Sequence, residues 1–147
     1  MLFGDVGADS ISACTPDSIA ARMVNETFLK TIDQYPDAHC PKYVIMPNHL
    51  HAIIVLGREY TEPDHTDTER ADMESAPTTL SAVIQSFKRH STIEYIKLVK
   101  RGSLPPFEKQ IWQRSYYDHI IRDEREYQQI WEYIHTNPLK WDEDCYR

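Results

Sequence analysis

Residues 43–56 read YVIMPNHLHAIIVL, and this stretch decides the fold that we expect. An apolar run over residues 43–46 precedes Pro47 and Asn48, a pair that marks a turn. A second apolar run then covers residues 49–56. The pattern predicts two strands joined by a tight turn.

The two histidines of this stretch share one face of the second strand. Successive strand side chains point to opposite faces, so His49 and His51 lie side by side, and Ile53 and Val55 continue their face. Two rigidly held imidazoles suit a divalent metal, but the stretch alone also fits two packed structural histidines. The opposite face is apolar as well, which predicts a strand covered on both sides: Leu50, Ala52, Ile54 and Leu56.

Length and composition indicate one ordinary domain. The chain has 147 residues and three cysteines, Cys14, Cys40 and Cys145, whose spacing fits neither a metal site nor a disulfide framework. A reducing compartment is therefore favoured, and we expect a cytoplasmic protein. No apolar run approaches the roughly 18 residues that a membrane span needs, so we expect no membrane partner.

The net charge of -7 is unevenly distributed. Residues 59–74 hold seven acidic side chains and one basic one, and we expect a long, mobile acidic loop at about 59–78. Residues 84–125 hold nine basic and five acidic side chains, so this half of the chain suits an anionic partner. Basic residues at a helix end also suit the helix dipole, which leaves both explanations open. The candidate contacts with DNA are Lys88, Arg89, Lys97 and Arg114.

Two segments before residue 102 have helical periodicity. The first begins with Thr15 as cap and Pro16 at the first helical position, and it ends near residue 35. Its apolar stripe is Ile19, Met23, Phe28 and Ile32. The second begins near Thr79 and has apolar residues at i, i+3, i+4 and i+7. Residues 91–94 have the spacing of a capping box, which predicts that this helix breaks and restarts there.

A final helix is predicted over residues 124–136. Asp123 caps it, and Pro138 ends it because the residue before a proline is pushed out of the helical region. Tyr133 and Asn137 lie four residues apart and face the same way, to one side of the apolar stripe. By this pattern alone, Tyr133 is either a packing aromatic or a functional phenol.

Residues 112–121, WQRSYYDHII, are rich in aromatic and branched side chains and predict a third strand. His119 within it is a packed strand residue or a ligand. The order helix, strand, strand, helix, strand, helix predicts an α+β domain with an antiparallel sheet.

The candidate residues suggest one chemistry. A phenol has a pKa of about 10 and is a weak nucleophile at neutral pH. It can attack a phosphodiester when a metal stabilises the charge that develops on the phosphoryl oxygens. Asn137 could offer an amide oxygen as a third ligand beside His49 and His51, one helical turn from Tyr133.

Three stretches resemble the IS200-like single-tyrosine transposases, in particular the REP-associated tyrosine transposases. They are HLH at 49–51, WQRSYYDHIIR at 112–122 and YIHTNP at 133–138, and the similarity runs from about Leu2 to Trp141. The resemblance implies an HUH endonuclease with a ferredoxin-like fold. Such enzymes use Mg²⁺ or Mn²⁺ to cut single-stranded DNA, form a 5′-phosphotyrosine link and rejoin strands, usually at a hairpin.

By the same resemblance, His49 and His51 match the metal-binding pair, Tyr133 the nucleophile and Asn137 the polar metal ligand. Family members usually have a strand before the segment that matches LFGDV, where this chain starts, so we expect the first strand of the sheet to be missing or truncated.

Two alternatives are kept beside the transposase. The histidine-triad nucleotide hydrolases need His-x-His-x-His, but Ile53 occupies the third position here. The other alternative is a decayed or domesticated protein that binds DNA hairpins without cutting them. We expect a monomer or a homodimer.

Overall fold

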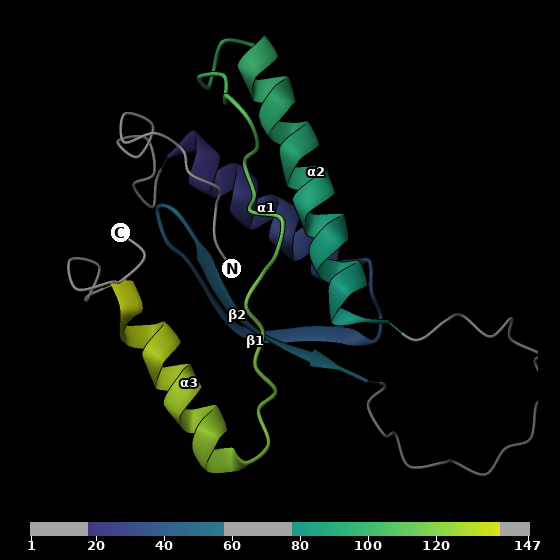
Figure 1. Cartoon of the computed structure of the whole chain (residues 1–147), viewed down its shortest axis with the longest axis vertical. Coiled ribbons are helices and arrows are strands. Elements are labelled where there is room, and N and C mark those ends of the chain that lie inside the picture. The colour runs from purple at the N-terminus through teal and green to yellow at the C-terminus, as the bar shows by residue number, and fades with distance from the viewer. Residues whose placement is uncertain (1–17, 58–77, 139–147) are drawn as a thin grey trace, which may run out of the picture.

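The structure is a computed structural model that describes residues 18–57 and 78–138. Figure 1 shows a two-stranded antiparallel sheet with α1 and α2 on one side and α3 on the other. This arrangement confirms the predicted α+β class. The LFGDV segment, Thr15, Pro16 and the acidic loop up to residue 77 lie outside the described residues. The elements in chain order are α1 (Ile19–Asp33), β1 (Ala38–Ile45), β2 (Leu50–Leu56), α2 (Leu80–Lys100) and α3 (Glu124–Thr136).

The predicted hairpin is confirmed. β1 and β2 pair antiparallel with Val44 opposite His51, and the Met46 backbone N–H donates to the His49 carbonyl at 2.8 Å across the turn. β1 begins at Ala38, before the predicted start, and its register shifts between residues 39 and 42. Pro41 lies within this irregularity, where a residue without a backbone N–H is tolerated.

The two faces of β2 contact different helices, as the alternation of its residues predicts. Leu50 belongs to the core formed with α1 and α2, and Ala52 and Ile54 pack against that core. His51, on the opposite face, contacts Tyr133 of α3. Helices thus cover both faces of β2 around the histidines, but the predicted coverage is wrong at the end of the strand, where Val55 and Leu56 are exposed.

The core on the α1 and α2 side is built around aromatic rings. Phe28 of α1 lies edge-on to Phe87 of α2, with ring centroids 5.4 Å apart, and its ring is 5.0 Å from that of Tyr43 on β1. These contacts join both helices to the hairpin. The buried members of the cluster are Met23, Val24, Phe28, Ile32, Leu50, Val83, Phe87, Ile111 and Trp112.

The beginning of α1 differs from the prediction. The helix starts at Ile19, and Ser18 caps it by accepting a hydrogen bond from the Ala21 backbone N–H at 3.1 Å. Ile19, which the periodicity assigned to the apolar stripe, is exposed. The stripe itself is otherwise confirmed, since Met23, Phe28 and Ile32 are buried.

α2 begins where predicted, with Thr79 as its cap, but the predicted break at residues 91–94 is wrong. The Ser91 hydroxyl donates to the Phe87 carbonyl at 2.7 Å and accepts from the Trp112 indole N–H at 2.8 Å. The Thr92 hydroxyl likewise donates back to the preceding turn. These hydroxyls bond to carbonyls four residues earlier instead of capping a new helix, so α2 continues to Lys100.

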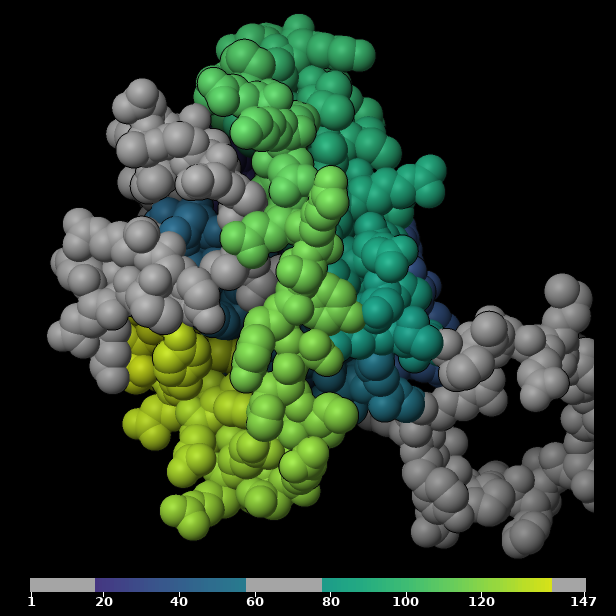
Figure 2. Space-filling view, in the orientation of Figure 1, coloured from purple at the N-terminus to yellow at the C-terminus, as the bar shows by residue number. Residues whose placement is uncertain are grey.

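The predicted strand at 112–121 is also wrong, because residues 113–121 are irregular. The carbonyls of Gln113 and Ser115 accept hydrogen bonds from the Lys88 ammonium at 2.7 and 3.1 Å, in place of a neighbouring strand. Strand propensity reflects how side chains fit a paired, half-buried sheet, and that setting is absent here. Figure 2 shows this part of the chain as a light-green ridge between α2 and α3.

Among the described residues, no helix combines the length and the apolar character that crossing a membrane requires.

Candidate functional site

The histidine pair lies where the hairpin turn enters β2. His49 is fully buried, and its ring stands edge-on to that of His51, with centroids 4.6 Å apart. The Nε2 atoms of both rings are buried. The strand alternation thus brings the two imidazoles together, as predicted from their spacing.

Asn48 fixes the orientation of His49. The Asn48 side-chain oxygen lies 2.6 Å from His49 Nδ1. An amide oxygen can only accept, so Nδ1 is the donor and Nε2 carries the lone pair of the neutral ring. Metal-binding histidines are usually oriented in this way by an oxygen behind them. The sequence pattern predicts Asn48 only as a turn residue, and its position next to His49 is the signal for this second role.

α3 is held against the opposite strand of the hairpin by Lys42. The Lys42 ammonium of β1 lies 3.3 Å from His135 Nδ1 and 5.1 Å from the centre of the Trp131 ring. Ile134, the one buried side chain of the helix proper, lies between these residues in sequence. The contacts fix the last turns of α3 over the face of the sheet that carries the histidines.

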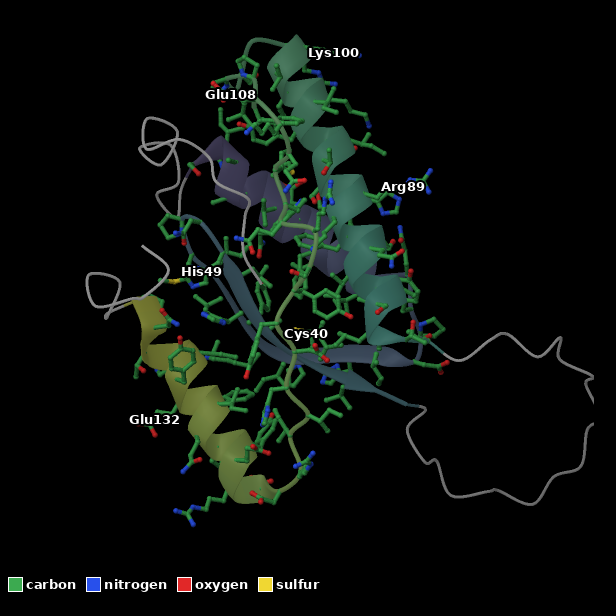
Figure 3. All side chains as sticks on the ribbon, in the orientation of Figure 1. Cys40, His49, Arg89, Lys100, Glu108 and Glu132 are labelled. Carbon is green, nitrogen blue, oxygen red and sulfur yellow. The ribbon has the colours of Figure 1, made fainter. Side chains whose placement is uncertain are left out.

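Tyr133 lies on this fixed part of α3 and contacts the histidine pair. Its ring is edge-on to that of His51, with centroids 5.3 Å apart. The side chain is 49% exposed, although its ring contacts that of His51. Figure 3 shows His49 on the side of the hairpin nearest the end of α3. The structure therefore brings the predicted nucleophile to the predicted metal ligands.

Asn137 follows one turn later, at the end of the helix. Its backbone N–H donates to the Tyr133 carbonyl, and Pro138 follows it, as predicted. The side chain is buried, and its amide nitrogen has no hydrogen-bond partner in the described part of the chain. A buried N–H without a partner is unfavourable, so an acceptor oxygen of a bound ligand would explain its presence, while a metal would be held by the oxygen of the same amide.

These side chains fit a divalent metal. Two imidazole nitrogens and one amide oxygen suit Mn²⁺, and Mg²⁺ would draw on the oxygen donor and on water. Within residues 18–57 and 78–138, no group of three or more His, Cys, Asp or Glu side chains could hold a metal. The amide oxygen of Asn137 would be the third protein ligand, as the sequence predicts, and further positions would be left for water and substrate oxygens.

The four candidate DNA contacts lie in different surroundings. The Lys88 ammonium donates hydrogen bonds to the backbone carbonyls of Gln113 and Ser115, and burial lowers its pKa. Lys97 pairs with Glu94 at 2.7 Å within α2. Arg89 and Arg114 are exposed, and Figure 3 shows Arg89 pointing outward from α2, away from His49. The structure does not bring the four together.

His119 proves to be neither a packed strand residue nor part of the histidine pair. Its Nε2 lies 2.6 Å from a Glu126 carboxylate oxygen, and the other carboxylate oxygen accepts from the Arg122 backbone N–H at 2.8 Å. The hydrogen bond from His119 and that from Arg122 hold the pKa of Glu126 below its usual range. This pair ties the irregular segment to the first turn of α3.

Comparison with known proteins supports the fold more strongly than any activity. No family model matches the chain. An uncharacterized protein of Haemophilus influenzae is 34% identical over 114 residues, a match that covers 75% of this chain and 59% of that protein. A solved structure of a REP-associated tyrosine transposase bound to a REP hairpin matches 99% of this chain and 66% of that one, with a TM-score of 0.61 and 20% identity.

The chain thus spans less than two thirds of each of these proteins. Its described elements, two antiparallel strands with helices on both faces, have the fold of the REP-associated tyrosine transposase.

Proposed function

We propose that this protein is a metal-dependent nuclease and strand transferase of the single-tyrosine transposase type, acting on single-stranded or hairpin DNA. The observation that carries the proposal is the contact between the half-exposed Tyr133 ring and His51, beside the buried His49. A core aromatic would be buried, whereas half of the Tyr133 surface is exposed. The sequence motifs that hold these residues support the same conclusion.

In the proposed reaction, the Tyr133 phenol oxygen attacks the phosphorus of a DNA phosphodiester. A bond forms between phosphorus and the phenol oxygen, and the bond from phosphorus to the 3′ oxygen of the leaving strand breaks. The phenol loses its proton to solvent, and the leaving 3′ oxygen gains one. A 3′ hydroxyl that later attacks the phosphotyrosine reverses these changes and rejoins a strand.

The chain's own residues supply position. Lys42 and Ile134 hold the last turns of α3 over the sheet, and this fixes where the phenol can reach. Asn48 orients His49. Mg²⁺ or Mn²⁺ bound by His49, His51 and Asn137 would supply positive charge to the phosphoryl oxygens.

The hairpin substrate is inferred from two sources. The solved transposase structure contains a REP hairpin, and the sequence motifs resemble the same family. The basic half of this chain adds exposed cations, Arg89 and Arg114, that suit a phosphate backbone.

A labelled hairpin with a single-stranded flank tests the proposal. The protein should cleave it with Mn²⁺ or Mg²⁺ and not with EDTA. Combined His49→Ala and His51→Ala should abolish cleavage, while His39→Ala, an exposed histidine on β1, should leave cleavage intact. Tight hairpin binding without cleavage at any metal concentration would favour the non-catalytic hairpin-binding protein instead.

A further inference from the structure

Two apolar side chains stand out on the irregular segment between α2 and α3. Tyr117 is 78% exposed and Ile120 is 71% exposed, the highest values among the large hydrophobic residues of the described chain. The proposed strand-transfer chemistry uses neither of them. Isolated exposed apolar residues are common, but here two lie three positions apart on one irregular segment, which Figure 2 shows as a ridge.

The backbone that carries them is fixed on the α2 side. The Tyr116 hydroxyl shares a 2.8 Å hydrogen bond with Ser81, and the Lys88 ammonium lies 5.7 Å from the centre of the Tyr116 ring. The same ammonium donates to the carbonyls of Gln113 and Ser115. Tyr116, the residue before Tyr117, is therefore held against α2.

The other side of the pair is fixed to α3. His119 and the Arg122 backbone N–H both bond to Glu126, in the first turn of the helix. Tyr117 and Ile120 thus lie on a short segment that is held at both ends and that leads directly into the helix carrying Tyr133. A preorganised surface of this kind loses little conformational freedom when it binds a ligand.

We propose that Tyr117 and Ile120 form a stacking surface for bases of the single-stranded DNA that flanks the hairpin, an inference that rests on the proposed function. Single-stranded nucleic acids are typically bound by exposed aromatic rings with cations beside them, and Arg114 and Arg122 are exposed on the same segment. A tyrosine ring stacks on any base, so the surface would hold the strand without reading its sequence.

The surroundings favour a nucleic acid over a protein partner. A protein interface of standard size needs an apolar centre that excludes water, whereas Tyr117 and Ile120 are accompanied by exposed charged neighbours. Arg114 and Arg122 flank the pair together with Asp118 and Asp123, so the formal charge of residues 114–123 is balanced, and the two exposed arginines are the groups that suit a phosphate backbone. A second copy of the chain remains the competing occupant, and the experiment includes it.

The test compares two labelled DNAs, a hairpin with a single-stranded flank and the same hairpin without it. Tyr117→Ala should weaken binding of the flanked hairpin about five-fold or more, as expected for loss of one stacked base. Tyr117→Phe should keep wild-type affinity, because the ring remains. Ile93→Ala, which removes an exposed apolar side chain from α2, is the control and should bind like wild type.

Affinity for the hairpin without a flank should be the same for all variants. A 2-aminopurine base in the flank should be quenched by the wild-type protein and by Tyr117→Phe, and less by Tyr117→Ala. Equal flank affinity for Tyr117→Ala and wild type would overturn the stacking surface while leaving Tyr133 chemistry intact. A wild-type dimer in sedimentation that Tyr117→Ala dissociates would also overturn it, in favour of a second copy. Failure of the wild-type protein to bind either DNA would refute the proposed function itself.

Discussion

Lys88 and Arg89 are adjacent cations on α2 for which the structure predicts opposite behaviour. Lys88 donates to the carbonyls of Gln113 and Ser115 and lies over the Tyr116 ring, whereas Arg89 is exposed. We expect Lys88→Met to destabilise the fold with little effect on the electrostatics of DNA binding. We expect Arg89→Gln to do the reverse.

The magnitude for Lys88 follows from its hydrogen bonds. Methionine keeps most of the aliphatic stem but removes the ammonium, so two backbone carbonyls lose a charged donor at 2.7 and 3.1 Å. Hydrogen bonds to charged groups contribute about 1.5–3 kcal/mol, and we assign that range to the pair together because part of the contact is solvent-exposed. For a chain of this length the melting temperature should fall by about 3–12 °C.

Thermal unfolding and salt-dependent DNA binding separate the two variants. Lys88→Met should melt early yet keep the wild-type slope of log affinity against log salt concentration. Arg89→Gln should melt like wild type and reduce that slope by about 0.7–0.9, the contribution of one phosphate contact. A Lys88→Met protein with an unchanged melting temperature and a flatter salt slope would refute the structural role and return Lys88 to the DNA interface.

Three further predictions concern single side chains. Asn48→Ala, which removes the oxygen behind His49 Nδ1, should weaken Mn²⁺ binding about 10- to 100-fold by calorimetry, while Asn48→Asp should retain it; equal affinity for all three proteins would contradict the orienting role. Burial raises the pKa of Cys40 from 9.0 to about 11, so less of the reactive thiolate is present at pH 8 in the folded protein. In a variant whose other cysteines are serine, the Cys40 thiol should therefore react with a disulfide reagent about 100-fold more slowly when the protein is folded than when it is unfolded. The raised pKa of Cys40 also stabilises the fold below pH 9, and this stabilisation should be lost as the pH rises towards 11. If the Cys40 thiol reacted equally fast in the folded and the unfolded protein, neither the raised pKa nor the pH-dependent stability would hold. Trp112→Phe should lower the free energy of unfolding by about 1–3 kcal/mol in a urea titration, because the buried Ser91 hydroxyl loses its indole donor, and an unchanged midpoint would show that the bond contributes nothing.

Local patterns predicted the elements whose causes are local. The bounds of α3 follow from Asp123 as cap and Pro138 after the last turn, and the structure has the helix over the predicted residues. The hairpin follows from Pro47 and Asn48 between two apolar runs. The facing of His49 and His51 follows from strand alternation alone, which also explains why their rings lie together.

The errors arose where a distant residue decides the local structure. The capping-box pattern at Ser91 is overridden by the Trp112 indole and by hydroxyl bonds to the preceding turn. The strand expected at 112–121 is replaced by an irregular segment because Lys88, more than 20 positions earlier in the chain, satisfies its carbonyls. Neither contact can be derived from sequence spacing.

Part of the candidate site could likewise not be predicted from the sequence. Spacing placed Tyr133 and Asn137 on one helix face, but the contact between Tyr133 and His51 depends on how α3 packs on the sheet. That packing rests on Lys42 and its neighbours on α3, which no motif identified. The metal-binding and nucleophilic roles themselves stay predictions.

The most direct test of the account is the covalent product of Tyr133. The protein is incubated with Mn²⁺ and a hairpin whose flank contains the cleavage site, and any protein–DNA adduct is digested and located by mass spectrometry. We predict an adduct on Tyr133 in the wild type and none in Tyr133→Phe, which keeps the ring against His51 and should fold and bind the hairpin normally. An adduct on Tyr116, Tyr117 or Tyr127, or full cleavage by Tyr133→Phe, would contradict the central claim.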